Sequence, residues 1–458
     1  MYIIDQNSKT PLHIQLYEEL KKDIIKNYSI DEKLPSIRKI ASTYNLSKNT
    51  VESAYTQLYA EGYIESYPKR GYFVSDLNYK EFNSDENIIL SQTKKKKEYL
   101  YDFFPARVAK ESFPIKLWKR LYNKAIDESL DFGIYPKGQG ESELCEEIAK
   151  YLIRSRGAKC ESYQVIITSG FAESMRLLSQ IIKEDHKNFA IEDPGYHVAR
   201  EVLEECGFDM DYINVDDNGL VLGELEKSDS KIVYITPSHQ YPKGVTMPIP
   251  NRQKLLEWSK KVNGLIVEDD YDSELTYYNR PIPCLQGLDN YDRVVYLGTF
   301  AKALSPALRV SYMVLPKHLL PRYEKLLDSY FSKVSISTQK TLALFMKDGY
   351  YDKHIRKMRT LNKKKHDLLK SLLKTHLGDT MKIEAEGAGL SILINPSKEF
   401  DWDKLKELAE QNSIKLYFAK DVSGGKWQAI RMGFGGFSEE ELKTSIELFS
   451  KIWHECLI

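Results

Sequence analysis

The stretch RVVYLGTFAKALSPALRVSYMV, residues 293–314, joins an apolar, β-branched run to a loop and then to a second apolar run. The first run predicts a strand that ends at Gly298, which places Lys302 in the loop that follows. Ligands of α/β sheets bind beyond the carboxyl ends of the strands, so Lys302 is a candidate site residue. Its apolar neighbours Phe300 and Leu304 favour a lowered amine pKa, which suits a lysine that forms a Schiff base.

The same rhythm extends upstream, where short β-branched runs alternate with longer amphipathic segments. The runs that predict strands are QVIIT (164–168), FAIEDP (189–194), KIVYITP (231–237) and GLIVEDD (264–270). This alternation predicts a doubly wound α/β domain with a largely parallel sheet. From about residue 320 the chain is rich in helix formers and lysine, and it ends with strand-like runs at 389–395 and 428–434. We therefore expect a smaller C-terminal α+β subdomain. Residues 321–385 carry no motif, and their lysines predict a solvated face.

Acidic residues follow one of these strands, in GLIVEDDYDSE (264–274). Pyridoxal 5′-phosphate (PLP) needs an anion opposite its ring nitrogen, and a nearby tyrosine can bond its phenolic oxygen. Asp269, Asp270 and Tyr271 suit those two tasks, and the chemistry leaves the two aspartates tied. The alternatives are an acidic loop or a metal site. The segment has no histidine, which argues against a transition metal, although spacing alone leaves Mg²⁺ open. We expect no metal site.

Two further features suit a phosphate group. In QVIITSGFAES (164–174), a strand is followed by Ser169 and Gly170 and then by the start of a helix, whose free amides can bind phosphate. Arg309 follows Lys302 in the chain and offers a guanidinium fork. Each signal is weak alone. The alternative interpretation of Lys302 and Arg309 is a lysine in a surface loop and an arginine at the end of the sheet.

The N-terminal residues predict a compact helical unit. Leu16, Leu20 and Ile24 share one face of a helix within PLHIQLYEELKKDIIKN, residues 11–27. A helix from about 36 to 44, a turn, and a second helix from about 48 to 61 then form a helix-turn-helix. Ser47 is the expected N-cap of the second helix, and Leu46 with Val51 forms a hydrophobic staple.

The second helix opens with Lys48, Asn49 and Thr50, and the N-terminal residues of such a helix reach base edges in the major groove of DNA. Two strand-like runs then flank Pro68 to Gly71, which predicts a basic hairpin. Residues 35–72 carry five Lys and Arg against three Asp and Glu, a small excess. On charge alone, an ordinary three-helix bundle with a surface hairpin remains the better interpretation.

Composition limits the remaining possibilities. The chain has 458 residues, with 66 Lys and Arg against 66 Asp and Glu, so zero net charge argues mildly against a nucleic-acid partner. Five cysteines without a CxxC pair predict neither a disulfide framework nor a zinc site, and most should lie in the core. No stretch approaches a membrane span, and no signal peptide is evident at the N-terminus, so we expect a soluble, cytoplasmic protein.

Three parts follow from this organisation: a compact helical unit at 1–75, a linker at 76–100 and a large α/β domain at 101–458. The family resemblances described below imply that the first is a DNA-binding domain and the third an effector domain. The linker is polar and weakly periodic, and it contains the run Lys94 to Lys97. A solvated tether is the favoured interpretation of that run, and an arm that contacts DNA is the alternative.

The order of the N-terminal parts resembles the GntR-type winged helix across about 65 residues. PLHIQLYEEL, LPSIRKIA, LSKNTVESAYTQLYAEGYI and the glycine-containing hairpin carry the resemblance. It implies that the matching positions contact DNA, namely Arg38, Ser47, Lys48, Asn49, Thr50, Arg70 and Gly71. The loop KNYSIDEKLPS lacks the glycines that are common in the family.

The rest of the chain resembles the fold-type I aminotransferases over about 350 residues, through ITSG, EDPGY, TPSHQYPKGV, EDDYDSE, GTFAKALSPALRVSYMV and IRMGF. Joined to the winged helix, it is similar to the MocR-type (GabR-like) regulators. The resemblance implies that Lys302 carries PLP as an aldimine, that Asp269 faces the ring nitrogen, and that Tyr271 bonds the phenolic oxygen. Phosphate would be bound by Gly170, Phe171, Thr299 and Arg309, with Tyr196 on the ring and Arg431 on an amino-acid carboxylate.

The resemblance also implies a function: a regulator that binds promoter DNA and senses an amine or amino acid through aldimine exchange, as a head-to-tail homodimer. Two departures put efficient transamination in doubt. Tyr241 stands where many aminotransferases have asparagine, and FFPARVAKES replaces a Gly-Pro-Asp-like turn. The alternatives are an active aminotransferase and a regulator that senses PLP itself to control vitamin B6 synthesis.

Overall fold

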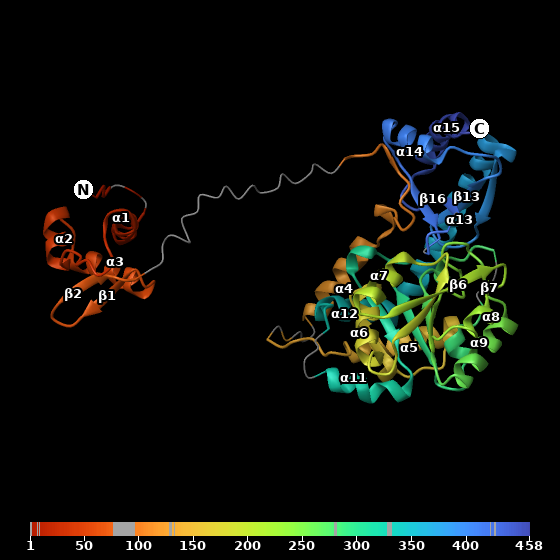
Figure 1. Cartoon of the computed structure of the whole chain (residues 1–458), viewed down its shortest axis with the longest axis horizontal. Helices are drawn as coiled ribbons and strands as arrows, with labels where there is room; N and C mark the ends of the chain where they lie inside the picture. The colour runs from red at the N-terminus through yellow and green to blue at the C-terminus, as the bar shows by residue number, and fades with distance from the viewer. Residues whose placement is uncertain are drawn as a thin grey trace. The chain divides into compact units, whose positions relative to one another are not determined.

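The computed structural model describes residues 2–6, 8, 10–76, 97–127, 131, 133–278, 282–327, 332–421, 423–425 and 427–458. The chain divides into two compact units, Met1–Lys96 and Lys97–Ile458, called here the N-terminal and C-terminal units (Figure 1). Most of the predicted linker, residues 77–96, lies outside the described residues, as does Lys94 to Lys96 of the lysine run. No described helix has both the length and the apolar composition to cross a lipid bilayer.

The N-terminal unit is a winged helix-turn-helix. Its elements are α1 (Leu12–Asn27), α2 (Ile37–Tyr44), α3 (Lys48–Ala60) and the antiparallel strands β1 (Ile64–Tyr67) and β2 (Gly71–Val74). Asn45 takes a left-handed conformation and ends α2, which forms the predicted tight turn. Leu16 and Leu20 of α1 pack with Val51 and Leu58 of α3 in one core. The predicted helices and hairpin are therefore confirmed.

The C-terminal unit is built on an eight-stranded sheet with the order β4-β11-β10-β9-β8-β5-β6-β7. Its strands are β4 (Val165–Thr168), β5 (Asn188–Asp193), β6 (Asp209–Asp216), β7 (Gly219–Leu220), β8 (Ile232–Ile235), β9 (Leu265–Asp270), β10 (Val294–Thr299) and β11 (Ser311–Val314). The sheet is largely parallel, as predicted. Strand β11 is an exception, since it runs antiparallel to both β10 and β4. The five predicted strands of this sheet are all present, whereas β6, β7 and β11 had not been recognised.

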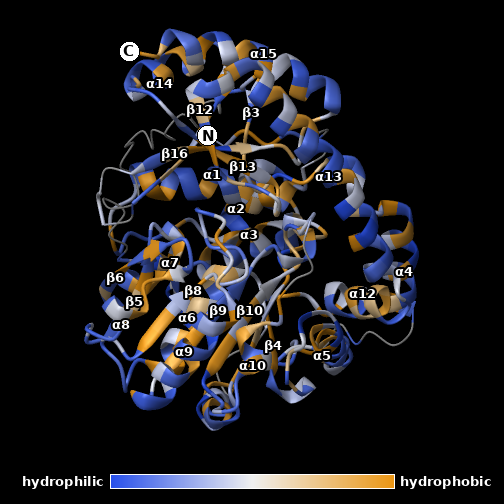
Figure 2. Cartoon of the chain, turned by 90° about the vertical axis from the view of Figure 1, so that its right-hand side faces the viewer, coloured by the Kyte–Doolittle hydropathy of each residue, from blue (hydrophilic) through white to orange (hydrophobic). Residues whose placement is uncertain are grey.

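Helices cover both faces of the sheet, as a doubly wound fold requires. The cores of one face include α6 (Phe171–Ile182), α7 (His197–Glu205) and α11 (Leu320–Leu326). The cores of the other face include α4 (Ile115–Asp127), α5 (Ser142–Arg156), α8 (Leu222–Leu225), α9 (Ile249–Lys261), α10 (Leu285–Leu288) and α12 (Ile336–Lys347). Figure 2 shows the strands between these helices as strongly apolar ribbons. Four of the five cysteines are buried, as predicted.

The smaller subdomain has a four-stranded sheet in the order β12-β13-β16-β15. Its elements are β3 (Tyr101–Asp102), α13 (Tyr350–Leu377), β12 (Met381–Ala385), β13 (Ser391–Pro396), α14 (Trp402–Gln411), β14 (Ile414–Lys415), β15 (Tyr417–Lys420), β16 (Gln428–Gly433) and α15 (Glu439–Glu455). The prediction that the lysines of 321–385 are solvated is wrong for Lys365, which is 6% exposed. Its Nζ donates to the Gly435 carbonyl at 3.1 Å, and burial lowers its pKa.

Candidate functional site: a lysine pocket and a winged helix

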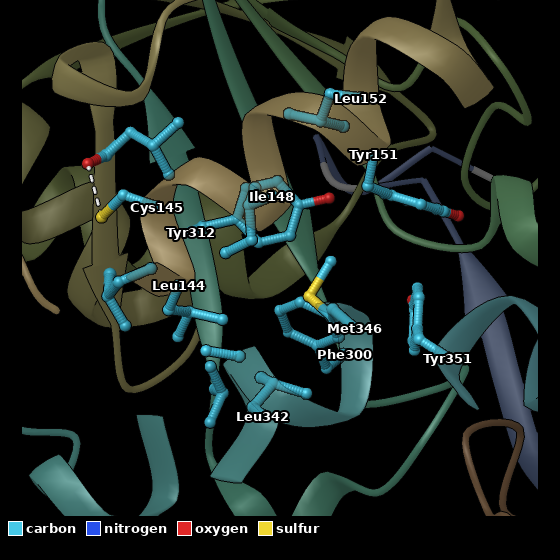
Figure 3. Packing of buried hydrophobic residues seen from close by; sticks show 14 of the residues in the cluster. Leu144, Cys145, Ile148, Tyr151, Leu152, Phe300, Tyr312, Leu342, Met346 and Tyr351 are labelled. Atoms are coloured by element: carbon cyan, nitrogen blue, oxygen red, sulfur yellow. Dashed lines mark hydrogen bonds between the residues drawn. The ribbon is translucent and has the colours of Figure 1, made fainter. Parts of the chain in front are cut away.

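Lys302 lies in the loop after β10, and the core beneath that loop fixes its position. Phe300 is 1% exposed and packs against Tyr312 and Tyr351 in the cluster drawn in Figure 3. The amine of Lys302 lies 3.9 Å from the centre of the Tyr271 ring and 3.6 Å from Oδ2 of Asp272. Burial lowers the pKa of Lys302 to about 8. A buried amine with such a pKa is deprotonated in part near neutral pH and can act as a nucleophile.

The period of two along β9 separates the two candidate carboxylates. Asp269 lines the same cavity as Lys302, and its Oδ2 accepts the Tyr234 hydroxyl at 2.6 Å. Asp270 instead pairs with Arg156, whose Nε donates to Oδ2 at 2.7 Å, and it also accepts the Tyr296 hydroxyl at 2.7 Å. Burial raises the pKa of Asp269 to about 7. The structure thus places Asp269, and not Asp270, where a ligand can reach it.

One cavity of about 510 Å³ gathers every residue that the sequence analysis assigned to the cofactor or the effector. These are Lys302, Asp269, Tyr271, Gly170, Phe171, Tyr196, Thr299, Arg309 and Arg431. Tyr196 packs edge-on against Phe171 and Tyr241, with ring centres 5.2 Å apart in both pairs. The volume lies within the range of small-molecule sites, roughly 300–1,000 Å³. The placement agrees with the assigned roles, and the roles themselves stay predictions.

One end of the cavity has the features of a phosphate cradle. Helix α6 begins at Phe171, after Gly170, and no side chain caps its first amides. A Cβ on Gly170 would stand 2.2 Å from Nη2 of Arg309, so only glycine lets the guanidinium lie against this helix start. Thr299 lines the same region, and its Oγ1 accepts the Ser311 hydroxyl at 2.9 Å. Amides and a guanidinium converge here, which is the arrangement that binds an anion.

Arg431 is held in the central part of the smaller sheet, on β16 between β13 and β15. It is 7% exposed, and its Nη2 donates to Oγ of Ser391 at 2.9 Å. The guanidinium carbon lies 4.3 Å from the centre of the Tyr241 ring. Tyr241, which replaces the asparagine of many aminotransferases, therefore packs under the predicted carboxylate-binding arginine.

These residues fit PLP on three independent grounds. The amine at Lys302 has a lowered pKa. The Asp269 carboxylate is buried and lines the same cavity. The Arg309 guanidinium lies against the start of α6, where a Cβ at Gly170 would clash with it. Together they supply a Schiff-base amine, an anion for a ring nitrogen and a site for a phosphate. Among the described residues, no group of His, Cys, Asp or Glu side chains is arranged to hold a metal ion.

Sequence reasoning missed three side chains around Lys302 and Asp269. Tyr234 reaches Asp269 from the neighbouring strand β8, and His239 and Asp272 lie in the loops after β8 and β9. The only sequence signal was a hydroxyl within the apolar run KIVYITP and one more aspartate after Tyr271. Their roles depend on which strands are neighbours, which is a tertiary property.

The N-terminal unit exposes most of the residues predicted to contact DNA. Ser47 caps α3, since its Oγ accepts the Thr50 amide at 3.1 Å, and it leaves Lys48 and Asn49 exposed. Arg38 is exposed on α2. At the hairpin, Gly71 has a φ of +104°, and the Arg70 guanidinium lies 5.3 Å from the centre of the Phe73 ring. The predicted cap is confirmed, and DNA contact by these residues stays a prediction.

Comparison with known proteins matches both units. Residues 12–74 match the gntR family of bacterial regulatory proteins, and residues 101–443 match the aminotransferase class I and II family. The crystal structure of Pyrococcus horikoshii kynurenine aminotransferase, in complex with PMP, shares the fold. Its TM-score is 0.71 at 24% identity, over 79% of this chain and 92% of that one.

Relatives span the whole length. The HTH-type transcriptional regulator YdeL of Bacillus subtilis strain 168 is 36% identical over 97% of both chains. The protein named probable rhizopine catabolism regulatory protein MocR, from Rhizobium meliloti, is 30% identical over 97% of this chain and 94% of its own. The HTH-type pyridoxine biosynthesis transcriptional regulator PdxR of Corynebacterium glutamicum is 27% identical over 96% and 95%. A GntR-type winged helix thus precedes a class I and II aminotransferase domain, and the chain belongs to the MocR-type family of transcriptional regulators.

Proposed function

We propose that this regulator holds PLP on Lys302 and changes its binding to promoter DNA when an amine or amino acid enters the same pocket. One observation carries the proposal: Lys302, Asp269 and Arg431 line a single cavity in a chain that also has an intact winged helix. The PLP-dependent fold of the relatives supports the cofactor. The effector therefore bears a primary amine, and Arg431 selects those that also carry a carboxylate.

When bound, PLP supplies an aldehyde that condenses with primary amines. Lys302 would hold the cofactor, Asp269 would keep its ring nitrogen protonated, and Tyr271 would be the partner of its phenolic oxygen. Arg309, Thr299 and the amides that follow Gly170 and open α6 at Phe171 would hold its phosphate, and Tyr196 would lie against the ring; all of these residues line the cavity. Arg431 orients the effector carboxylate with its guanidinium fork, already fixed by Ser391.

For the N-terminal unit, we propose that α3 enters the major groove with Lys48, Asn49 and Thr50 toward the bases. Ser47 and Arg38 hold the phosphates beside it, and Arg70 with Gly71 carries the hairpin to the adjacent groove or backbone. A head-to-tail homodimer would place two such units on a repeated operator, which raises affinity through effective concentration.

The C-terminal unit also offers a route from the pocket to the linker. Phe104, Pro105 and Ala106 line the pocket, and they lie a few residues after the linker ends. We propose that effector binding repositions this segment and so biases the chain that leads to the winged helix. Such a bias shifts a pre-existing equilibrium, in proportion to the difference in affinity for the two states.

The test combines spectroscopy with a gel shift on the full-length protein and DNA from upstream of its own gene. Wild type incubated with PLP should gain a visible absorbance band that Lys302→Ala lacks. A panel of amino acids and amines should include one class that changes DNA affinity, and Arg431→Ala should lose that response but keep the band. Arg176→Ala, an exposed arginine paired with Glu205, is the matched control. An unchanged spectrum for Lys302→Ala would refute the cofactor assignment.

Two other functions predict different results. An aminotransferase would form product over many turnovers with an amino acid and a keto acid, although Tyr241 under Arg431 changes the site that such enzymes use. A regulator of vitamin B6 synthesis is favoured by the similarity to PdxR, whose name assigns it to pyridoxine biosynthesis. In that case PLP alone would change DNA affinity, with no amine required.

A further inference from the structure

Asp272 is a buried carboxylate that the proposed cofactor chemistry does not use. It follows Tyr271 and is 2% exposed. Its Oδ2 lies 2.9 Å from Nδ1 of His239 and 3.6 Å from Nζ of Lys302. A Cβ at Gly389 would stand 2.5 Å from the same oxygen, and the φ of +69° at Gly389 also favours glycine. The carboxylate is therefore confined at a point between the imidazole and the amine.

His239 holds this arrangement together. A carboxylate can only accept a hydrogen bond, so His239 donates from Nδ1 to Asp272 and the imidazole carries its proton on that nitrogen. The carbonyl of His239 accepts the Tyr271 hydroxyl at 2.8 Å, and the Tyr271 ring lies against the Lys302 amine. Among the described residues, the other ring nitrogen, Nε2, is buried without a hydrogen-bond partner. His239 therefore contacts both neighbours of Lys302. Its Nδ1 lies 2.9 Å from Asp272 and 3.4 Å from the Tyr271 hydroxyl, so the contact with Asp272 is the shorter of the two.

The charges around Lys302 oppose one another. Burial and the guanidinium of Arg431 lower the pKa of the Lys302 amine, whereas the carboxylates of Asp272 and Asp269 raise it. Of the two carboxylates, Asp272 raises the pKa of the Lys302 amine more than Asp269 does. Burial alone would raise the pKa of Asp272, but His239, Lys302 and Arg431 together hold it below its ordinary value. Asp272 thus stays ionised and is the main counter-charge of the Lys302 ammonium.

We propose that Asp272, held in place by His239, is a positioning residue that binds the free ammonium of Lys302 and sets the pH at which the amine becomes reactive. The inference rests on the proposed function, in which Lys302 is the amine that takes up PLP. Asp272 then provides a binding partner for Lys302 whenever the lysine is not bonded to the cofactor. His239 acts through Asp272, and neither residue is assigned a direct contact with PLP.

The loading reaction tests this directly. The neutral Lys302 amine attacks the aldehyde of PLP, a C=N bond forms and water leaves, so the rate follows the fraction of neutral amine. The rate at which the visible band appears is measured from pH 6 to 10 on cofactor-free, full-length protein. Asp272→Asn removes the charge and keeps the shape. The midpoint of the pH–rate profile of this variant should move to lower pH by about one unit or more, since an opposite charge at such a distance shifts a pKa by roughly 1–3 units.

Matched variants separate charge from structure. Asp352→Asn, a half-buried aspartate paired with Arg154 and remote in sequence from the pocket residues, should leave the profile unchanged. His239→Asn keeps a donor to Asp272 and should retain the wild-type midpoint, whereas His239→Leu removes the donor and should shift the midpoint toward that of Asp272→Asn. PLP titrates identically in every sample, so differences between variants belong to the protein. The comparison of His239→Asn with His239→Leu still tests the inference if Asp272→Asn fails to fold.

The outcomes are distinct. A folded Asp272→Asn variant that loads PLP with the wild-type midpoint would overturn the inference and leave the proposed function intact. Equal midpoints for His239→Asn and His239→Leu would also contradict it. A wild-type protein that gains no visible band, and in which borohydride fails to lock PLP onto Lys302, would remove the proposed function and the inference with it.

Discussion

At the scale of single residues, the pocket separates neighbours that share the same chemistry. Asp269 and Asp270 are adjacent carboxylates, yet the pleat of β9 turns one toward the cavity and the other toward Arg156. Asp270 is part of a buried ion pair that supports the fold. Asp269 accepts the Tyr234 hydroxyl, and burial keeps its pKa raised, which a cationic ring nitrogen would offset.

The raised pKa of Asp269 predicts how stability depends on pH in the cofactor-free protein. Its pKa is about 7 when folded and about 3.9 when unfolded. The folded state therefore binds more protons between these values, and stability falls as pH rises through this window. Asp269→Asn should be more stable than wild type by at least about 1 kcal/mol at pH 8, and the difference should shrink toward pH 4. Denaturant unfolding at several pH values measures it, and a constant difference would contradict the expectation.

Gly170 should affect the affinity for PLP and not the reactivity of the Lys302 amine. Gly170→Ala brings a methyl group to 2.2 Å from Nη2 of Arg309 and puts a φ of +142° on alanine. The guanidinium must then move off the start of α6, and a lost charge-assisted contact lowers PLP affinity by about tenfold, since such bonds are worth roughly 1.5–3 kcal/mol. Gly223→Ala in α8, where a Cβ meets nothing within 4 Å, is the control. Titration of the visible band with PLP gives both affinities.

At the scale of elements, helix α3 combines a structural cap with an exposed face that we predict to contact DNA bases. Its buried side, Val51, Ala54, Tyr55 and Leu58, fixes the helix to the core. Because the cap Ser47 bonds the Thr50 amide, the first turn is held and Asn49 is left toward solvent. The hydrophobic pattern and the cap were sufficient to predict this helix, since both are local signals.

Asn49→Ala should weaken binding to the upstream DNA by about tenfold, because a bidentate asparagine contact with adenine contributes roughly 1–3 kcal/mol of discrimination. Thr56→Ala, also exposed but two turns further along α3, should have no effect. Gel shifts with the native fragment and with an unrelated fragment compare the two variants. Equal loss on both fragments would indicate a phosphate contact, and no loss at all would contradict the assignment of α3.

The segment between the linker and the large domain is the second element of interest. Phe103 is fully buried, its amide donates to the Lys415 carbonyl at 3.1 Å, and its carbonyl accepts the Gly433 amide at 3.1 Å. A Cβ at Gly433 would stand 2.4 Å from the Phe104 carbonyl oxygen, so the segment lies directly on the strand that carries Arg431. The Phe104 ring, 44% exposed, packs 5.3 Å from that of Tyr417 at the pocket.

Occupancy of the pocket should therefore slow hydrogen exchange at residues 97–107. The probe is the reduced conjugate of PLP with L-alanine, which carries both a phosphate and an α-carboxylate. Amides of this segment should become protected relative to the protein with PLP alone, whereas those of α9, on the far side of the sheet, should not change. Equal exchange with and without the conjugate would disconnect the segment from the pocket.

At the scale of the whole molecule, charge is a poor guide to DNA binding. Residues 1–76, which contain the winged helix, carry ten Lys and Arg against ten Asp and Glu, so this part is as neutral as the whole chain. The basic residues that we predict to contact DNA, Arg38, Lys48 and Arg70, are defined by their place on α2, α3 and the hairpin. A neutral unit gains little from long-range attraction, and its affinity should depend on pairing with a second copy.

Removal of one half of the protected DNA should therefore weaken binding by at least tenfold, because paired sites commonly gain 10²–10⁴ in affinity. Footprinting first defines the protected region, and fragments that keep either half are then compared with the full region. Sedimentation of the protein at the same concentrations reports its oligomeric state. Equal affinity for half and full regions would show that one N-terminal unit suffices.

The sequence by itself determined the parts of this protein that depend on short-range signals. The strand and helix periods, the cap at Ser47 and the motif order around Lys302 each occupy a few consecutive residues, so no knowledge of packing was needed. The tertiary structure decided what those parts meet: Tyr234 beside Asp269, His239 and Asp272 beside Lys302, and Phe104 as a wall of the pocket. Such contacts join separate strands and loops, and strand order in the sheet, which alone makes them neighbours, leaves no local pattern in the chain.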